Sequence, residues 1–362
     1  MKAAVLTEVG KPLEMQDVTI SKPGPREVLL RTSAAGVCHS DLHFQNGSYP
    51  IRELPAVLGH ESSAIVEQVG EDVKYVKPGD HVITCLSAFC GHCGHCTTGS
   101  PALCQSPEVG RDAAQESRLS QGDTVVGQFA NLSSFAEQML VHEHAIVKIR
   151  EDMPLDRAAL IGCGVLTGTG AVFHRAEIEP GSTVVVLGCG GVGLSCVNGA
   201  SIAGAGRVIA VDMVEAKLKL AETFGATDTV NPKDGDPVEQ VQSLLGGGAD
   251  YTFEAIGLKV TAEQAFNMLA PGGTATIIGM IPVGTSIEIH GPLFLQERKI
   301  QGSLMGSHSF RVAMPRLIDF YLSGKLKLDD LIASRIKLEQ INDAMNALNT
   351  GEHARDVIVF DH

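Results

Sequence analysis

Residues 183–193, which read TVVVLGCGGVG, decide the fold of the second half of the chain. The apolar run Thr183–Leu187 predicts a buried strand, and Gly188–Gly193 follows the pattern G-x-G-x-x-G. The small residues of Leu194–Ala203 then predict a helix. A strand, a glycine turn and a helix in this order are typical of dinucleotide binding, because free N–H groups at the helix N-terminus face the pyrophosphate.

A second strand, predicted at Arg207–Val211, ends at Asp212, which lies 19 residues after Gly193. A carboxylate at this place accepts a hydrogen bond from the ribose 2′-hydroxyl and repels a 2′-phosphate. Met213 follows, where an arginine would favour the phosphate. The sequence therefore predicts NAD rather than NADP as the cofactor.

Strands and helices continue to alternate after Asp212. The predicted helices are 214–224, 261–269 and 314–323, and the predicted strands are 251–255, 275–278, 300–304 and 357–360. Alternation with continuously apolar strands predicts an α/β domain, a Rossmann doubly wound parallel sheet with helices on both faces. Residues 1–160 instead show short β segments between Gly/Pro turns, such as 28–30, 63–66 and 81–84, so this part is expected to be mainly β.

The composition narrows the class of protein. A chain of 362 residues suggests two domains, and 44% hydrophobic residues with 19% charged residues indicate a globular protein. The formal net charge of −14 disfavours nucleic acid as a partner. The N-terminal segment has no apolar stretch and the chain has no long apolar run, so no membrane partner is expected and a cytoplasmic location is predicted.

Four of the nine cysteines lie close together, with the spacing C-x2-C-x2-C-x7-C. They are Cys90, Cys93, Cys96 and Cys104. Four thiolates at this spacing can enclose a tetrahedral zinc ion and leave no open position, which indicates a structural metal. An iron–sulfur cluster also uses four cysteines, and unrelated free thiols are a second alternative.

Cys38, His60 and Cys163 form a possible second metal site, although they are far apart in the sequence. Two thiolates and one imidazole leave a fourth zinc position for water or substrate, which is the arrangement of a catalytic zinc. Such a site can deprotonate an alcohol and still allow hydride to leave the alkoxide. Taken singly, each residue also has an ordinary explanation, as a buried packing cysteine or a surface histidine.

Several segments, in order along almost the whole chain, resemble the zinc-containing medium-chain alcohol dehydrogenases. They are Gly36–His43, Gly59–Glu61, the four cysteines, Ile161–Gly168, the glycine loop and Arg355–Phe360. The resemblance implies a GroES-like catalytic domain at 1–164 and 305–362, and a Rossmann domain at 165–304. It also implies two zinc ions per chain, with Cys38, His60 and Cys163 holding the catalytic one.

The same resemblance assigns roles to other residues. Glu61 would lie behind the catalytic zinc, Asp41 would orient the zinc histidine, and Ser40 with His43 would relay the substrate proton. The residues that would contact NAD are His39, Thr167, Gly188, Gly190, Gly191, Val192, Gly193, Asp212, Lys217 and Arg355.

The substrate is the least defined part of the prediction, because residues 105–128 do not follow the family. By position, Leu86, Phe129, Met280 and Leu304 would line the pocket, and their apolar character favours an apolar alcohol over a sugar. The alternative is that all four side chains pack in the hydrophobic core and do not contact substrate. Arg111 and Arg118 could bind an anionic substrate, but we interpret both side chains as solvated charges on a loop.

The predicted function is interconversion of a small-molecule alcohol and its aldehyde or ketone with NAD, in a homodimer or homotetramer. The alternative within the same fold is a polyol dehydrogenase or one acting on a glutathione–formaldehyde adduct. A non-enzymatic zinc module is a third class. Retention of all three open-site ligands and of the relay pair argues against it.

Overall fold

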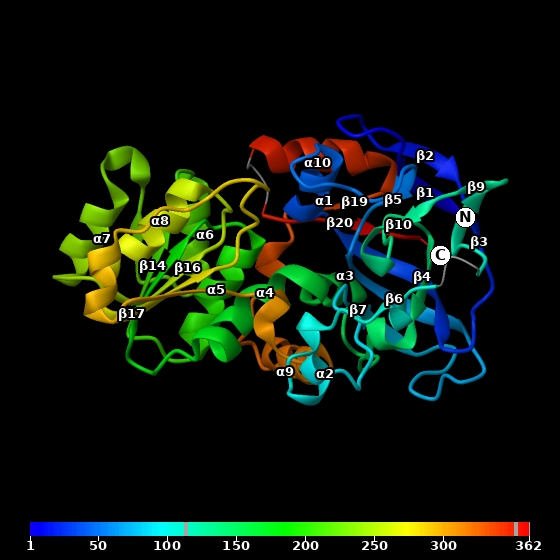
Figure 1. Cartoon of the computed structure of the whole chain (residues 1–362), viewed down its shortest axis with the longest axis horizontal. Coiled ribbons are helices and arrows are strands. Elements are labelled where there is room, and N and C mark those ends of the chain that lie inside the picture. The colour runs from blue at the N-terminus through cyan, green and yellow to red at the C-terminus, as the bar shows by residue number, and fades with distance from the viewer. Residues whose placement is uncertain (112–114, 351–353, 362) are drawn as a thin grey trace. The chain divides into compact units, whose positions relative to one another are not determined.

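The computed structural model describes residues 1–111, 115–350 and 354–361 (Figure 1). The chain divides into two compact units. Unit 1 comprises Met1–Cys163, His308–Asp319 and Leu328–His362, and unit 2 comprises Gly164–Ser307 and Phe320–Lys327. The domain limits predicted from the sequence remain a proposal. No helix in the described part of the chain is long and apolar enough to span a membrane.

Unit 1 is built on β-sheets, as its short apolar segments predict. Its largest sheet has the order β12-β7-β6-β4-β20-β19, and β11 also pairs with β4. These strands are β4 (Glu27–Gly36), β6 (Glu61–Val69), β7 (His81–Thr84), β11 (Gln138–His142), β12 (Ile146–Lys148), β19 (Ser334–Ile336) and β20 (Asp356–Val359). The antiparallel register of β20 on β4 pairs Val357 with Gly36, so the end of the chain lies beside the end of β4.

Two smaller sheets complete the β part of unit 1. One has the order β10-β5-β1-β2 and the other β3-β8-β9. Their strands are β1 (Lys2–Leu6), β2 (Glu14–Asp17), β3 (Thr19–Ile20), β5 (Ala56–Val57), β8 (Leu119–Gln121), β9 (Thr124–Val125) and β10 (Gly127–Gln128). Unit 1 also holds α1 (His39–Gln45), α2 (Gly94–Thr97), α3 (Leu155–Leu160), α10 (Ile341–Thr350) and the start of α9 (Phe310–Leu322).

Unit 2 is a six-stranded parallel sheet with helices, which confirms the Rossmann prediction. The strand order is β15-β14-β13-β16-β17-β18, and all five pairings are parallel. The strands are β13 (Thr183–Leu187), β14 (Arg207–Val211), β15 (Asp228–Val230), β16 (Ala249–Glu254), β17 (Leu269–Ile277) and β18 (Lys299–Gly302). The helices are α4 (Leu166–Gly170), α5 (Gly191–Ile202), α6 (Glu215–Phe224), α7 (Pro237–Leu245) and α8 (Lys259–Asn267).

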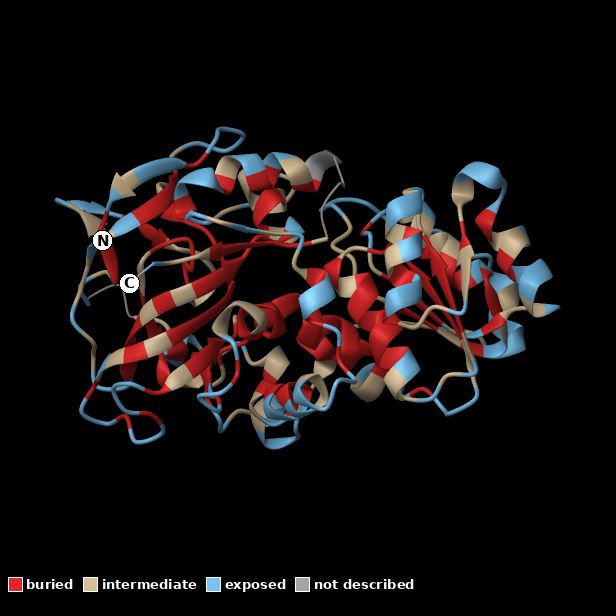
Figure 2. Ribbon diagram, turned by 180° about the vertical axis from the view of Figure 1, so that it is seen from behind, coloured by how far each residue is buried: buried red, intermediate tan, exposed pale blue. Residues whose placement is uncertain are grey.

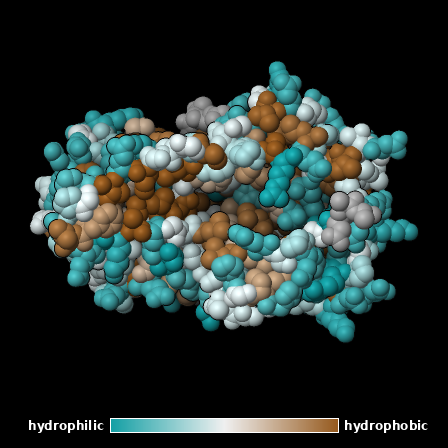
Figure 3. Space-filling model, viewed as in Figure 1, coloured by the Kyte–Doolittle hydropathy of each residue, from teal (hydrophilic) through white to brown (hydrophobic). Residues whose placement is uncertain are grey.

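The central strands of this sheet are buried on both faces, which is why they read as continuous apolar runs (Figure 2). Exposed apolar side chains are nevertheless frequent in unit 2, where Val283 is 69% exposed and Leu295 89%. Figure 3 shows apolar surface gathered over this unit, on the left of the view. A homodimer or homotetramer remains a prediction.

The element boundaries differ from the sequence prediction in a few places. Helix α5 begins at Gly191 rather than Leu194, because the last glycines of the loop already form its first turn. Helix α9 begins at Phe310 rather than Met314, and continues through Pro315. Because proline has no N–H, Pro315 cannot donate the backbone hydrogen bond to the carbonyl four residues earlier. Helix α3, Leu155–Leu160, lies at the end of the part expected to be mainly β.

Candidate functional site

The three predicted open-site ligands come together in unit 1, as the sequence predicts. Cys38 is the N-cap of α1, His60 directly precedes β6, and Cys163 lies in the helical turn after α3. All three side chains are buried, and their ligand atoms lie within 4.8 Å of one another. His60 Nε2 is 3.2 Å from Cys163 Sγ, close to the roughly 3.6 Å expected when both bind one tetrahedral zinc.

Asp41 holds two of these ligands in place. Its Oδ1 atom lies 3.0 Å from His60 Nδ1 and also accepts a hydrogen bond from the Gly59 amide. Its Oδ2 atom accepts from the Cys38 amide at 3.3 Å. A carboxylate on Nδ1 keeps the proton there and leaves the Nε2 lone pair directed toward Cys163, which is the tautomer that a metal ligand needs.

Arg355 is the buried cation of this site. Its Nη2 atom is 3.5 Å from Cys38 Sγ and its Nε atom is 3.5 Å from Glu61 Oε1. A side chain on Gly36 would overlap the Glu61 carboxylate, so glycine at the end of β4 makes room for Glu61. A hydrogen bond from Cys163 and the charge of Arg355 lower the pKa of Cys38 well below its ordinary value despite burial. Cys38 is therefore favoured as a thiolate, the form that binds zinc.

The predicted role of Arg355 at the cofactor phosphates remains a proposal. The structure places its guanidinium inside unit 1 against Cys38 and Glu61, and the residue is only 4% exposed. The sequence carries no local signal for this position, because the contact joins residues 317 positions apart.

The proposed relay residues lie on α1. Ser40 Oγ is 3.7 Å from Cys38 Sγ, so it lies beside the metal ligands. His43 follows about one turn later, and its Nδ1 atom is buried with no hydrogen-bond partner in the part of the chain that the structure describes. Burial lowers the pKa of His43, although the Cys38 thiolate opposes this, so the imidazole is neutral near pH 7. His39 is exposed on the same helix, 5.9 Å from His43 between ring centroids.

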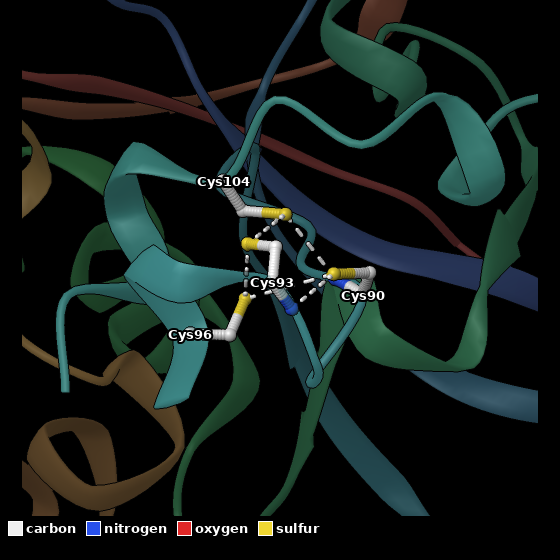
Figure 4. Close-up of side chains that lie close together, drawn as sticks. All are labelled: Cys90, Cys93, Cys96 and Cys104. Atoms are coloured by element: carbon white, nitrogen blue, oxygen red, sulfur yellow. Dashed lines mark hydrogen bonds between the residues drawn. The ribbon is translucent and has the colours of Figure 1, made fainter. Parts of the chain in front are cut away.

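The four clustered cysteines form the second metal group, with their sulfur atoms turned toward one another (Figure 4). Cys93 Sγ is 3.4 Å from Cys96 Sγ and 3.8 Å from Cys104 Sγ, and Cys90 Sγ is 3.9 Å from Cys96 Sγ. Tetrahedral Zn–S bonds would separate the sulfurs by about 3.8 Å. Backbone amides of Cys93 and Cys90 donate to the sulfurs of Cys90 and Cys104, which stabilises thiolates. The residues present fit a closed, structural zinc site.

The glycine loop of unit 2 fits a pyrophosphate. Gly188 has φ +94°, and a side chain on Gly193 would overlap the Gly188 carbonyl, so both positions need glycine. Gly190 is the N-cap of α5, and a side chain there would meet open space. Gly191 and Val192 begin the helix, so their amides point toward this space. The N-terminus of α5 thus offers unobstructed donors to an anion.

Asp212 lies at the end of β14, as predicted. Its two carboxylate oxygens accept from the amides of Cys189 at 2.8 Å and Val214 at 2.9 Å. Asp212 therefore joins the glycine loop to the start of α6, a contact that the sequence pattern does not show. Lys217 lies in the first turn of α6, and Thr167 is buried in α4 with its hydroxyl 3.6 Å from Met305 Sδ. Their contacts with NAD remain proposals.

The four predicted substrate-contacting residues lie in both units. Phe129 packs edge-on against the zinc ligand His60, with 5.8 Å between ring centroids, and against Phe44 at 4.7 Å. Leu86 is half-buried against the core of unit 1. In unit 2, Met280 is half-buried and Leu304 is 51% exposed. Sequence reasoning missed Phe44, although it directly follows the relay histidine.

The interpretation of Arg111 and Arg118 as solvated loop charges is wrong. Arg118 is 5% exposed, and its Nε atom lies 2.7 Å from Glu27 Oε1. Arg111 Nη2 lies 2.5 Å from Glu27 Oε2 and its side chain is largely buried. A buried carboxylate needs paired cations, and the two arginines satisfy Glu27.

Comparison with known proteins agrees with this geometry. The family profile "Alcohol dehydrogenase GroES-like domain" matches residues 24–151, and "Zinc-binding dehydrogenase" matches residues 191–320. An "Alcohol dehydrogenase class-3" from Cereibacter sphaeroides is 36% identical over 374 aligned residues, which cover 99% of each chain. The chain belongs to the zinc-binding medium-chain alcohol dehydrogenase family.

Other relatives of this alcohol dehydrogenase include an "Alcohol dehydrogenase 1" from Pisum sativum, 35% identical over 99% of this chain and 97% of the relative. Among solved structures, the benzyl alcohol dehydrogenase of Acinetobacter calcoaceticus is 34% identical with a TM-score of 0.94, covering 99% of each chain. The protein is a zinc-dependent alcohol dehydrogenase with a catalytic Cys38–His60–Cys163 group and a structural four-cysteine group.

Proposed function

We propose that this alcohol dehydrogenase interconverts an apolar alcohol and its aldehyde or ketone, with NAD as the hydride acceptor. The observation that carries the proposal is the group of three buried ligands rather than four at Cys38, His60 and Cys163. Three protein ligands leave one zinc position for the substrate oxygen. A zinc ion held there supplies a Lewis acid, which lowers the pKa of a bound hydroxyl toward neutrality.

The chain's own residues prepare the site for this chemistry. Asp41 fixes the tautomer of His60, and Arg355 offsets the negative charge of Cys38 and Glu61. Phe129 packs against one side of His60, and Phe44 packs against Phe129. Low polarity around the site strengthens the attraction between charges, which favours the deprotonated alcohol.

The substrate proton is proposed to leave through Ser40. A hydroxyl can accept one proton while donating another, and Ser40 lies beside Cys38 at the ligand group. His43 is the proposed next acceptor, because its ring is neutral near pH 7 and Nδ1 makes no hydrogen bond with the described residues. A neutral imidazole can take the proton and exchange it with solvent.

NAD is proposed over NADP because of Asp212. The carboxylate at the end of β14 carries a negative charge where a ribose 2′-phosphate would be repelled. Gly188, Gly190 and Gly193 leave the α5 N-terminus open to pyrophosphate. His39, Thr167, Lys217 and Arg355 are proposed as further cofactor contacts.

An apolar alcohol is proposed over an anionic adduct. Leu86, Phe129, Met280 and Leu304 are proposed to contact the substrate. Arg111 and Arg118, the cations considered for reading an anion, are both paired with Glu27. This pairing removes the reason for preferring a glutathione–formaldehyde adduct, although several relatives carry the name "Alcohol dehydrogenase class-3".

The test is NADH formation by the zinc-loaded protein over a panel of alcohols. Ethanol, benzyl alcohol, a secondary alcohol, a polyol and S-(hydroxymethyl)glutathione should be compared at one pH, each with NAD and with NADP. We expect the highest kcat/KM for an apolar alcohol with NAD. A higher kcat/KM for the polyol or for the glutathione adduct would overturn the substrate proposal, and no turnover of any alcohol would overturn the activity.

A further inference from the structure

The loop that carries Phe129 has an unusual backbone. Ala130, Asn131 and Ser133 have φ values of 54°, 57° and 62°. Seven non-glycine residues of the described chain have positive φ, and three of them fall in this short loop. Asparagine tolerates the left-handed region, but alanine and serine are strained there. Strain of this kind persists only where surrounding contacts enforce it, and it gathers at functional sites.

Ser133 enforces the conformation from inside the loop. Its hydroxyl is buried, accepts a hydrogen bond from the Phe129 amide at 2.9 Å and donates to the Val57 carbonyl at 2.7 Å. One side chain thus joins the backbone of Phe129 to strand β5. Removing the hydroxyl would leave a buried donor and a buried acceptor without their partner.

Gln128 stabilises the same loop conformation from the N-terminal end of the loop. Its Nε2 atom donates to the carbonyls of Leu132 at 3.3 Å and Leu140 at 2.8 Å. Its Oε1 atom accepts from Arg118, which is itself held by Glu27. The buried ion pair of Glu27 therefore supports the loop as well as satisfying the arginines.

The chain directly after this loop also hydrogen-bonds to the segment that precedes the zinc ligand His60. The Ser134 amide donates to the Gly59 carbonyl, and the Phe135 amide donates to the Leu58 carbonyl. A Cβ on Gly59 would lie 2.6 Å from the Phe135 nitrogen, so the two segments are in close contact next to His60. Any movement of the loop would change how Phe129 lies against His60.

We propose that Phe129–Ser133 is a strained specificity loop, in which Ser133 and Gln128 hold Phe129 edge-on to His60 and so favour alcohols with an aromatic or bulky apolar group. The inference rests on the proposed function, because Phe129 acts on an alcohol at the zinc ligands. Ser133 and Gln128 are positioning residues, since they act through Phe129. The backbone strain at Ala130 and Ser133 makes the loop less stable than an unstrained loop would be, while the position of the Phe129 ring stays fixed.

The experiment compares zinc-loaded full-length variants in two assays. Ala130→Gly relieves strain without removing a hydrogen bond, and Ser133→Ala removes the hydroxyl while keeping the strained backbone. Phe129→Leu removes the aromatic contact, and Ser133→Ala/Phe129→Leu combines both changes. Glu177→Gly is the matched control, because Glu177 is exposed in unit 2 with φ 50°.

The first assay is the ratio of kcat/KM for benzyl alcohol to that for ethanol. We expect Ala130→Gly and Ser133→Ala to lower this ratio by about tenfold, the usual effect of one misplaced apolar contact, with zinc content unchanged. The double variant should fall no further than Phe129→Leu, because the loop acts through that ring. Glu177→Gly should leave the ratio unchanged.

The second assay does not depend on turnover. The chain has 12 phenylalanines, so protein labelled with fluorophenylalanine gives a countable set of ¹⁹F resonances, and the one lost in Phe129→Leu is that of Phe129. We expect this resonance to shift in Ser133→Ala and Ala130→Gly but not in Glu177→Gly. If Ser133→Ala does not fold, Ala130→Gly decides both assays.

An unchanged Phe129 resonance in both loop variants would overturn the inference whatever the enzyme's substrate. So would a shifted resonance together with an unchanged benzyl alcohol to ethanol ratio in an active enzyme. Absence of activity in the wild-type protein with every alcohol would instead contradict the proposed function, and the resonance would still report whether Ser133 positions Phe129.

Discussion

Arg355 lies with its Nη2 atom 3.5 Å from the sulfur of Cys38, although the two residues are 317 positions apart. Strand β20 begins directly after Arg355 and pairs with the end of β4, which directly precedes the Cys38 segment. The sheet register therefore brings a permanent positive charge to a thiolate ligand. The same guanidinium faces Glu61, so one positive charge lies between two buried negative groups.

The first prediction concerns this charge. Arg355→Met should lower the melting temperature and speed the loss of one zinc ion to a chelator, because removing one partner of a buried ion pair costs on the order of 3–5 kcal/mol. Arg355→Lys should lie between the wild type and Arg355→Met, since it keeps the charge but not the fork of donors. If Arg355→Met weakens only NAD binding and retains both zinc ions, the residue serves the cofactor phosphates alone.

The second prediction separates the two metal sites. Elemental analysis should find two zinc ions per wild-type chain and one in each of Cys163→Ser and Cys93→Ser. Cys163→Ser should abolish turnover with a small change in melting temperature, while Cys93→Ser should give a lower melting temperature or insoluble protein. Iron in place of zinc, or equal destabilisation by the two substitutions, would contradict the division into catalytic and structural sites.

The third prediction concerns cofactor choice. Asp212→Asn and Asp212→Gly should both raise kcat/KM with NADP relative to NAD, because each removes the negative charge that repels the 2′-phosphate. The glycine variant should also melt at a lower temperature, since the amides of Cys189 and Val214 lose their acceptors. Retention of the wild-type preference in both variants would show that Asp212 does not face the ribose.

The fourth prediction concerns proton transfer. Ser40→Ala should reduce turnover by roughly 10²–10⁴-fold, the usual contribution of a general acid–base step, with zinc content unchanged. His43→Gln should cost less, because solvent can partly replace a group near the surface. If the Ser40→Ala enzyme keeps wild-type turnover, the substrate proton does not leave through Ser40.

The pH profile provides the control for His43. Burial lowers the pKa of His43 below 6.5, and only the neutral ring accepts a proton. Titration of His43 should therefore not change turnover above pH 6.5. Turnover should fall as the pH drops through the lowered pKa of His43, because the ring becomes protonated. His43→Gln should remove this acidic limb, and an unchanged limb would assign it to another group.

The sequence by itself determined the features that depend on short spacing. Two such features are the glycine loop between β13 and α5 and the cysteine group at 90–104. Each lies within 15 or fewer consecutive residues, so the residue types and the spacing between them are enough to predict it. The alternation of apolar strands and helices likewise predicted the parallel sheet of unit 2. The trio Cys38, His60 and Cys163 is distant in sequence and could be proposed only through the resemblance to a family.

Only the tertiary structure decided which distant residues support that trio. The ion pair of Arg118 with Glu27, the contact of Phe129 with His60 and the approach of Arg355 to Cys38 leave no local pattern in the chain. Each depends on strand register and on loop backbone angles. Those are fixed by burying the whole core and pairing most of the polar groups in it, so no short segment contains the information.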